Sequence, residues 1–260
     1  NRNPGLAIPL VALQYNDVTL KISTRALTSL VNTDGTLVAG TVAPEIKLWV
    51  DYIFLDADEK RRFAENKHEY LIEQVQRQEQ NATATVRLNL SHSVKELIWV
   101  IQDPTVITAA IAGDADLDST KNINGTLEKK NDWFCYLSQS TTANNEQING
   151  QKSEEAFGTL KLELNGMERF KARKASYFRT VQPQSCGHRV PEKHIYMYSF
   201  ALKPEEHQPS GACNFSKVDV GKMIFTSVAT NTPSPKITIF AVNYNVLKII
   251  GGMGALSYNG

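Results

Sequence analysis

A regular alternation of apolar and polar residues is the feature that most constrains how this chain can fold. The alternation is clearest at residues 18–23, 46–52, 84–90 and 159–164, where aliphatic side chains occupy every second position. Successive side chains of a β-strand point to opposite faces of a sheet, so this spacing gathers the apolar residues on one face. These segments therefore predict antiparallel sheets with one packed face and one solvated face.

Further segments complete an all-β pattern. Three of them are apolar on both faces, which is typical of strands covered on two sides, and a fourth candidate runs over residues 220–228. The three are residues 97–101, 195–202 and 237–250. The last is expected to break at Asn243 and Asn245. Turn signals such as Asn165-Gly166 separate about eight or nine strands, a number that a two-sheet jelly roll accommodates. The predicted fold class is all-β, a jelly-roll β-sandwich.

Helical signals are few. Asp56 and Glu59 have the spacing of a capping box, which predicts a short helix that continues to residue 65. Residues 173–181 are expected to form another turn or two. Residues 103–157 are rich in Asn, Thr, Ser, Asp and Gly, and we interpret them as one long surface loop excursion from a sandwich. Strand-like sequence resumes after this loop, so a single jelly-roll domain is expected over residues 1–260.

Composition excludes several classes of protein. With 28 Lys and Arg against 27 Asp and Glu, the chain lacks the strongly basic character of a nucleic-acid-binding domain. No apolar run approaches the roughly 18 residues of a membrane span. Cys135, Cys186 and Cys213 predict no disulfide framework, although one pair could form, and a reducing compartment is the simpler interpretation. The first residue is Asn1, and the chain is interpreted as a fragment or processed product with sequence missing upstream.

Motifs of metal and cofactor chemistry are incomplete. An acidic run at residues 114–118 resembles the start of a calcium loop, but Ser119 and Gly125 stand where glycine and glutamate are needed. The histidines form no His-x-His pair, and Cys186-x-His188 lacks the second ligand pair of a zinc site. Residues 251–254 resemble a dinucleotide-binding loop, but too little chain follows to form its helix, so a glycine-rich turn is favoured. We predict no enzyme activity, no metal and no cofactor.

Two further patterns have both a functional and a structural interpretation. A basic cluster with interleaved aromatic residues is the best nucleic-acid candidate, but we interpret it as a loop and short helix that contact a neighbouring acidic surface. The cluster comprises Arg169, Lys171, Arg173, Lys174 and Arg179. Four Asn-x-Ser/Thr sequons occur, at Asn81, Asn89, Asn124 and Asn214. Asn81 and Asn124 lie in loop-like sequence and are the better candidates for N-glycosylation, but an unmodified asparagine is favoured at each site.

Long stretches of the chain resemble the major capsid proteins of nucleocytoplasmic large DNA viruses of the phycodnavirus, mimivirus and marseillevirus kind. Residues 4–15 look like the family's entry into its second jelly roll, residues 48–63 resemble its strand and short-helix unit, and residues 243–254 its closing turn. The most specific stretch, residues 190–219, reads VPEKHIYMYSFALKPEEHQPSGACNFSKVD. Its signature residues, expected to be structural, are Pro204, Gln208, Pro209, Ser210, Gly211, Asn214 and Phe215.

The resemblance implies a role that composition cannot supply. Family members carry two jelly rolls in one chain, and three chains form a pseudo-hexagonal capsomer that tiles an icosahedral shell. The resemblance therefore implies a structural protein of the virion capsid, assembled in the host cytoplasm, and this chain corresponds to the C-terminal jelly roll. Implied partners are two further copies, neighbouring capsomers and minor capsid proteins, above an internal membrane and without direct nucleic-acid contact.

Three alternatives stay open. A single-jelly-roll minor capsid or penton protein fits the length of the chain. A carbohydrate-binding jelly roll would use exposed aromatic residues; of Trp49, Trp99 and Trp133, only Trp133 lies in the long loop and is suitably placed. A cupin-like metalloenzyme is disfavoured by the arrangement of the histidines.

Overall fold

The computed structural model describes residues 4–30, 45–102, 133–134, 136, 155–228 and 235–258. No helix in these ranges is long and apolar enough to cross a membrane. The helical elements are η1 (Pro4–Leu6), η2 (Leu10–Ala12), α1 (Leu27–Leu30), α2 (Ala57–Glu65), the π-helix η6 (Tyr177–Val181), α3 (Gln182–Ser185) and η7 (Phe215–Lys217). The strands are β1 (His68–Asn81), β2 (Thr85–Leu88), β3 (Ser93–Gln102), β4 (Thr159–Leu164), β5 (Met167–Lys174), β6 (Tyr196–Ser199), β7 (Cys213–Asn214), β8 (Gly221–Phe225), β9 (Lys236–Ile250) and β10 (Met253–Leu256).

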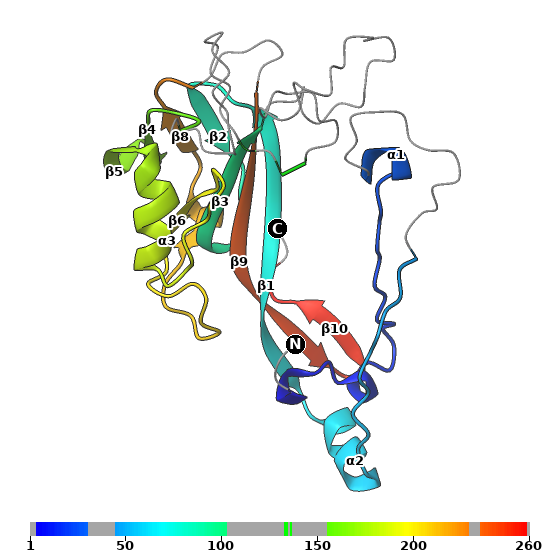
Figure 1. Cartoon of the computed structure of the whole chain (residues 1–260). Helices are drawn as coiled ribbons and strands as arrows, with labels where there is room; N and C mark the ends of the chain where they lie inside the picture. Colours follow the sequence, from blue (N-terminus) through cyan, green and yellow to red (C-terminus); the bar gives the residue numbers. More distant parts are fainter. Residues whose placement is uncertain are drawn as a thin grey trace. The chain divides into compact units, whose positions relative to one another are not determined.

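The described strands form two sheets (Figure 1). A six-stranded sheet has the order β1-β9-β3-β6, with β10 paired to β9 and β7 to β3. A four-stranded sheet has the order β2-β8-β4-β5, and its ladders are antiparallel. One hydrophobic cluster draws on both sheets, with Val86, Leu160 and Met223 from one and Trp99 and Ile239 from the other. The sheets therefore pack face to face as a sandwich, which confirms the all-β prediction.

The chain divides into two compact units. One comprises Asn1–Thr24, Val42–Gln74 and Tyr244–Gly260, and the other comprises Arg25–Thr41 and Val75–Asn243. The second unit contains the sandwich core. β1 and β9 contribute residues to both units.

Local sequence explains several elements. Asp56 caps α2, because its carboxylate Oδ1 accepts a hydrogen bond from the backbone N–H of Glu59 at 2.8 Å, as predicted. Asn165 and Gly166 both adopt positive φ and join β4 to β5 as a two-residue hairpin turn. The glycine-rich turn predicted near the C-terminus is also present, since Gly251 and Gly252 adopt positive φ between β9 and β10.

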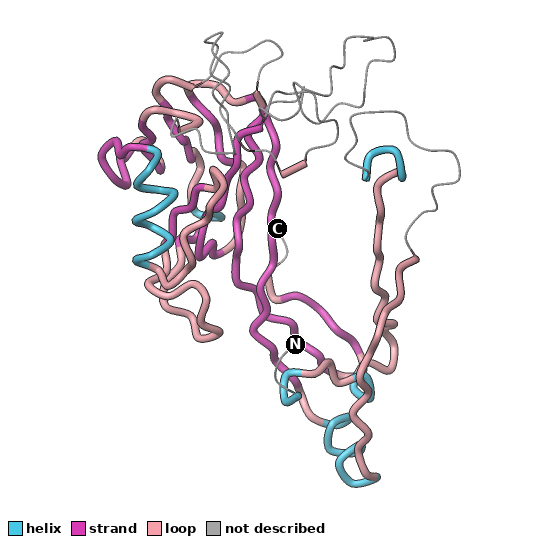
Figure 2. The backbone as a smooth tube through the Cα atoms, in the orientation of Figure 1, coloured by secondary structure: helices cyan, strands magenta, loops and turns pink. Residues whose placement is uncertain are grey.

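Other elements differ from the expectation. Residues 18–23 and 46–52 alternate like strands but have no ladder partner within the described chain, and Figure 2 draws them as loop. β9 runs unbroken through Asn243 and Asn245, because buried side-chain hydrogen bonds satisfy both asparagines inside the strand. Four of the described strands were not predicted: β1, which is rich in glutamine, β5, which carries most of the basic cluster, and the short strands β7 and β10.

The long excursion is only partly described. Of residues 103–157, the structure describes Trp133, Phe134, Tyr136 and residues 155–157. Ala156 and Phe157 are buried in the sandwich core, so the end of the excursion is core and not surface. The rest of the predicted loop, including the acidic run at 114–118, lies outside the described residues. The expected helix at 173–181 begins later than predicted, because β5 extends through Lys174.

Candidate functional site

The signature loop, residues 204–211, is built to hold one shape. Pro204 is buried, whereas residues 205–209 are exposed. The Ser210 hydroxyl closes the loop: it accepts a hydrogen bond from the Lys203 backbone N–H at 2.9 Å and donates one to the Lys203 carbonyl at 3.2 Å. Gly211 has φ +142°, and a Cβ there would lie 2.9 Å from the Phe200 carbonyl oxygen, so a larger residue does not fit.

The second part of the signature is tied into the core. The Asn214 side chain accepts a hydrogen bond from the Ser216 backbone N–H at 3.0 Å and begins η7. Phe215 is buried, and its ring packs edge-on against Phe200 at a centroid distance of 5.7 Å. The Ser216 hydroxyl accepts a hydrogen bond from the backbone of His92 at 2.8 Å.

These contacts give five signature residues a structural part, in loop closure, capping or the core: Pro204, Ser210, Gly211, Asn214 and Phe215. Gln208 and Pro209 are exposed, and the structure gives neither a particular role. The exposed tip is thus held by anchored residues on both sides.

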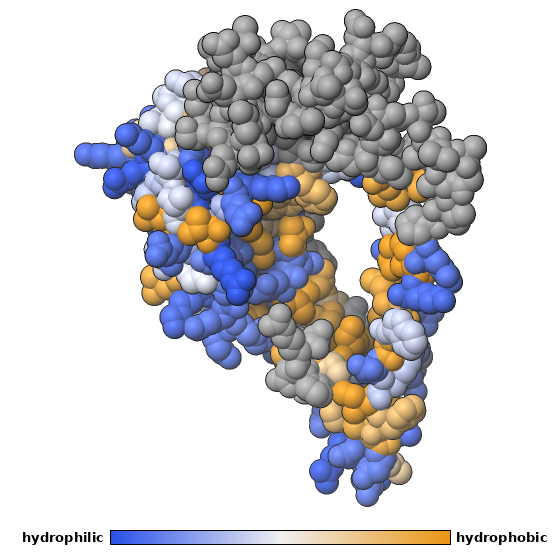
Figure 3. Space-filling view, viewed as in Figure 1, coloured by the Kyte–Doolittle hydropathy of each residue, from blue (hydrophilic) through white to orange (hydrophobic). Residues whose placement is uncertain are grey.

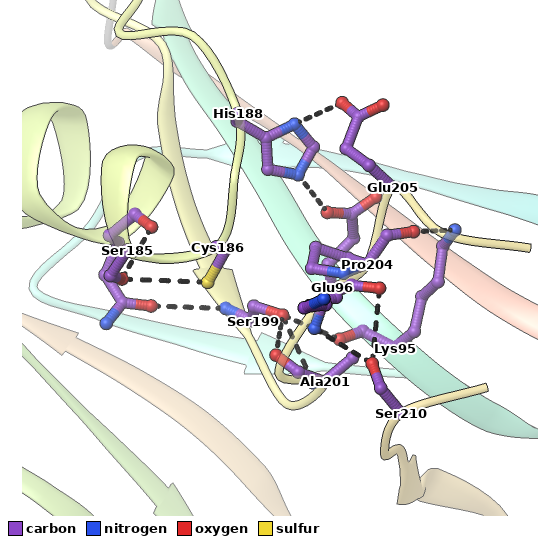
Figure 4. Close-up of polar contacts among 12 residues, drawn as sticks. Lys95, Glu96, Ser185, Cys186, His188, Ser199, Ala201, Pro204, Glu205 and Ser210 are labelled. Atoms are coloured by element: carbon purple, nitrogen blue, oxygen red, sulfur yellow. Dashed lines mark hydrogen bonds and ion pairs between the residues drawn. The ribbon is translucent and has the colours of Figure 1, made fainter. Parts of the chain in front are cut away.

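Two adjacent buried charges on β3 hold the start of the signature loop (Figure 4). The Lys95 ammonium donates to the Pro204 carbonyl oxygen at 2.7 Å. The Glu96 carboxylate lies 3.0 Å from Nε2 of His188, and Nδ1 of the same ring lies 2.6 Å from the Glu205 carboxylate. His188, which the sequence offered only as half of a weak zinc motif, therefore bridges two carboxylates.

A second polar network lies at the end of the long excursion. The Arg179 guanidinium binds the Glu155 carboxylate through two nitrogens, with contacts of 2.8 to 3.2 Å. The Tyr196 hydroxyl also donates to Glu155, at 3.0 Å, and accepts from the Ala156 backbone N–H. Burial lowers the pKa of His194, whose Nε2 lies 3.9 Å from Glu155, and burial raises the pKa of Tyr196. The network anchors residues 155–157 to η6 and β6.

Glutamine side chains of β1 make hydrogen bonds to the backbone of residues 87–91, in place of a paired strand. The Gln76 amide donates to the Ser91 carbonyl at 2.7 Å and accepts from the Ser91 N–H at 3.0 Å. Gln78 donates to the Arg87 carbonyl at 2.6 Å and accepts from the Asn89 N–H at 2.9 Å. Each amide thus satisfies both a backbone donor and a backbone acceptor, as a neighbouring strand would.

Segments from opposite ends of the sequence meet in the first unit. The Tyr15 backbone N–H donates to the Gly252 carbonyl at 2.9 Å, and a Cβ at Gly252 would lie 2.6 Å from the Tyr15 ring. The Gly254 N–H donates to the Asn16 side chain at 3.3 Å. Two of the family-like stretches, near residues 4–15 and 243–254, therefore contact each other.

The same unit exposes much apolar surface, which Figure 3 shows as hydrophobic residues at the surface. Val18, Leu20 and Ile22 are each more than half exposed. Residues 46–54 carry Lys47 and Asp51 but are otherwise apolar, and Trp49 and Phe54 are 90% and 89% exposed. Large exposed apolar surfaces of this kind mark protein–protein contacts.

The remaining candidates within the described chain are the tryptophans and the metal-binding side chains. The Arg25 guanidinium lies 3.5 Å over the Trp133 ring, and the ring Nε1 donates to the Ser29 carbonyl, so one ring face and the polar atom are already in use. Trp99 is fully buried. Within the described ranges, no group of three or more His, Cys, Asp or Glu side chains could hold a metal ion.

The basic cluster lies mainly on β5, and the candidate sequon at Asn81 lies at the end of β1. Arg169, Lys171, Arg173 and Lys174 are exposed on β5, an edge strand whose register shifts twice against β4. Bulges and basic side chains are usual devices that keep an edge strand from pairing with other chains. Asn81 is exposed at the end of β1, and Asn124 lies outside the described residues.

Comparison with known proteins gives consistent matches. A family model described as large eukaryotic DNA virus major capsid protein matches residues 59–255, and one described as major capsid protein N-terminus matches residues 1–56. The chain is 37% identical to a major capsid protein of Paramecium bursaria Chlorella virus 1 and 35% identical to one of Phaeocystis pouchetii virus. Each match covers 99% of this chain and 64% or 63% of the relative. The chain therefore spans a little under two thirds of the length of these relatives.

Solved structures agree. A model of the PBCV-1 virus capsid superposes with a TM-score of 0.71 at 33% identity, covering 100% of this chain and 68% of that one. A Faustovirus major capsid protein matches with a TM-score of 0.53 at 16% identity over 75% of this chain and 36% of that one, which supports the fold alone. Together with the two antiparallel sheets, these neighbours confirm the predicted jelly-roll sandwich.

Proposed function

Because the chain belongs to the family of major capsid proteins of large eukaryotic DNA viruses, we propose that it is part of a shell subunit that assembles as a homotrimeric capsomer. The observation that carries the proposal is the pair of matches to major capsid protein family models over residues 1–56 and 59–255. The exposed apolar surface of residues 18–22 and 46–54 supports it, because such a surface is expected to be covered in the complete, assembled subunit. The role is structural and not catalytic, and the location is the virion capsid, assembled in the cytoplasm of the host cell.

The domain organisation is part of the proposal. Residues 59–255 form the second jelly roll of a double jelly-roll subunit, and residues up to about 56 complete the first, as the two family models support. This narrows the single domain that the sequence predicted over residues 1–260. On this arrangement, the strands that pair with residues 46–54 come from the remainder of the full-length protein, which would explain why the large apolar side chains of that segment are exposed here.

Light scattering during size-exclusion chromatography tests the assembly. The full-length protein is expected to elute with three times the mass of one subunit. Replacing Leu48 and Val50 with serine should lower the trimer yield, because their side chains, 61% and 55% exposed here, would lie in the completed sheet. A full-length protein that stays monomeric at high concentration would refute the proposal. Neighbouring capsomers and minor capsid proteins are the further partners proposed, with an internal membrane beneath and no direct nucleic-acid contact.

A second proposal concerns modification. Asn81 carries an N-linked glycan, because it is exposed where β1 ends and its sequon continues through Ala82 to Thr83. Asn214 is less suitable, since its side-chain oxygen already accepts the Ser216 N–H. Asn124 stays a prediction. Peptide mass spectrometry of virion protein, before and after enzymatic glycan release, tests the site, and an unmodified Asn81 peptide at full abundance would refute it.

A further inference from the structure

We propose that His188 is a proton-dependent latch that fixes the signature loop to strand β3. The ring lies between two carboxylates, with Nε2 3.0 Å from Glu96 and Nδ1 2.6 Å from Glu205 (Figure 4). Ionised carboxylates only accept hydrogen bonds, and a neutral imidazole carries a proton on only one of its two nitrogens. Both contacts can therefore be hydrogen bonds together only when the ring is a protonated imidazolium.

Burial decides which contact opens when the proton leaves. The Glu96 side chain is 7% exposed, so an unpaired carboxylate there would be costly. The Glu205 side chain is 63% exposed, so water can solvate it once it is released. The remaining ring proton therefore stays on Nε2, facing Glu96, and the contact that opens is the one between Nδ1 and Glu205.

The other charged groups around the ring set the limits of the movement. Lys95, next to Glu96 on β3, holds the Pro204 carbonyl oxygen at 2.7 Å through a contact that does not involve His188. Lys203 pairs with Glu206 at 2.9 Å in the same loop, on solvated side chains. The buried thiol of Cys186 lies two residues before the histidine and contacts Ser185. The loop thus remains attached at Pro204 and loosens along its exposed tip, residues 205–209.

The latch gives the exposed tip two states. The tip is ordered while the His188 ring is protonated and contacts both carboxylates, and looser once the ring is neutral. The inference goes beyond the assembly role and does not depend on it, because it needs only the contacts among β3, the segment after α3 and the signature loop. It identifies the tip as a surface whose order responds to the pH that a virus particle meets.

Hydrogen–deuterium exchange of the full-length protein tests the latch. The wild type is compared with His188→Gln, Glu205→Gln and the matched control Glu206→Gln at several values between about pH 5.5 and 8.5. Taking the ratio of variant to wild-type exchange at each pH removes the intrinsic pH dependence of the exchange chemistry. The peptide that covers residues 205–209 provides the readout.

At the acidic end, His188→Gln and Glu205→Gln should each exchange about tenfold faster than the wild type in this peptide, the loss of one charge-assisted hydrogen bond. The ratio for Glu205→Gln should fall toward one at the basic end, and Glu206→Gln should follow the wild type throughout. A Glu205→Gln ratio that does not change with pH, or equal loss of protection in Glu206→Gln, would overturn the proposal. Glu205 is exposed, so its variant tests the latch even if His188→Gln does not fold.

Discussion

Gln76 offers a direct test of the idea that glutamine side chains act as substitute strand partners. Its amide donates to the Ser91 carbonyl at 2.7 Å and to Asn243 Oδ1 at 3.0 Å, and it accepts from the Ser91 N–H at 3.0 Å and hydroxyl at 3.3 Å. Replacement by methionine keeps the volume and removes all four contacts. A net hydrogen bond contributes about 1 kcal/mol, and the longest contact contributes less. We therefore expect Gln76→Met to lower the free energy of unfolding by about 2–3 kcal/mol.

Gln80→Met is the matched control. Gln80 lies on the same face of β1 and donates to the Arg87 carbonyl at 3.0 Å, but that carbonyl also accepts from Gln78. Losing a redundant and exposed contact should cost no more than about 0.5 kcal/mol. Urea unfolding of both variants measures the difference. Equal midpoints for the two variants would refute the reasoning, because the amide contacts of Gln76 would then contribute nothing beyond those of an exposed glutamine.

Two further predictions follow from the first unit and from the network at Glu155. Gly252→Ala should lower the free energy of unfolding by about 2–3 kcal/mol, because the new Cβ would lie 2.6 Å from the Tyr15 ring and the residue would keep a strained φ of +84°. At Gly251 a Cβ meets no neighbour, so Gly251→Ala should cost only about 1 kcal/mol, from backbone strain alone. Thermal or chemical unfolding measures both variants. Equal costs would show that the Tyr15 contact is unimportant. Because the pKa of His194 is lowered in the folded protein, the unfolded chain binds a proton at this histidine more readily than the folded chain does. The contribution of neutral His194 to the free energy of unfolding is therefore complete above the ordinary histidine pKa and is lost as the pH falls below it. His194→Gln should flatten that slope between about pH 8 and 5, and an unchanged slope would assign the effect to another group.

Local chemistry made part of the fold predictable. The cap at Asp56 and the turn at Asn165-Gly166 depend on residues only a few positions apart, so their patterns are complete in the sequence. β1 was missed because a strand rich in glutamine has little of the β-branched and aromatic content that indicates a strand. Its polar face becomes favourable only when Ser91 is beside it in three dimensions.

The alternating segments show what a local pattern cannot predict. Alternation at residues 18–23 predicts which side chains share a face but not which strand supplies the hydrogen bonds, and no described residue supplies them here. The candidate site behaves in the same way. Residues 204–211 were recognisable as a signature, but the bridge from Glu96 through His188 joins positions 92 residues apart and follows no spacing rule.

Electron cryomicroscopy of the capsomer formed by the full-length protein tests the proposed trimer of double jelly-roll subunits most directly. We predict three copies around a central axis, each with two sandwiches, and residues 46–54 inside a sheet whose other strands come from outside residues 59–255. The side chains of Trp49 and Phe54, 90% and 89% exposed in this chain, should be covered there. A single sandwich per subunit, or a map in which residues 46–54 remain in solvent, would contradict the account.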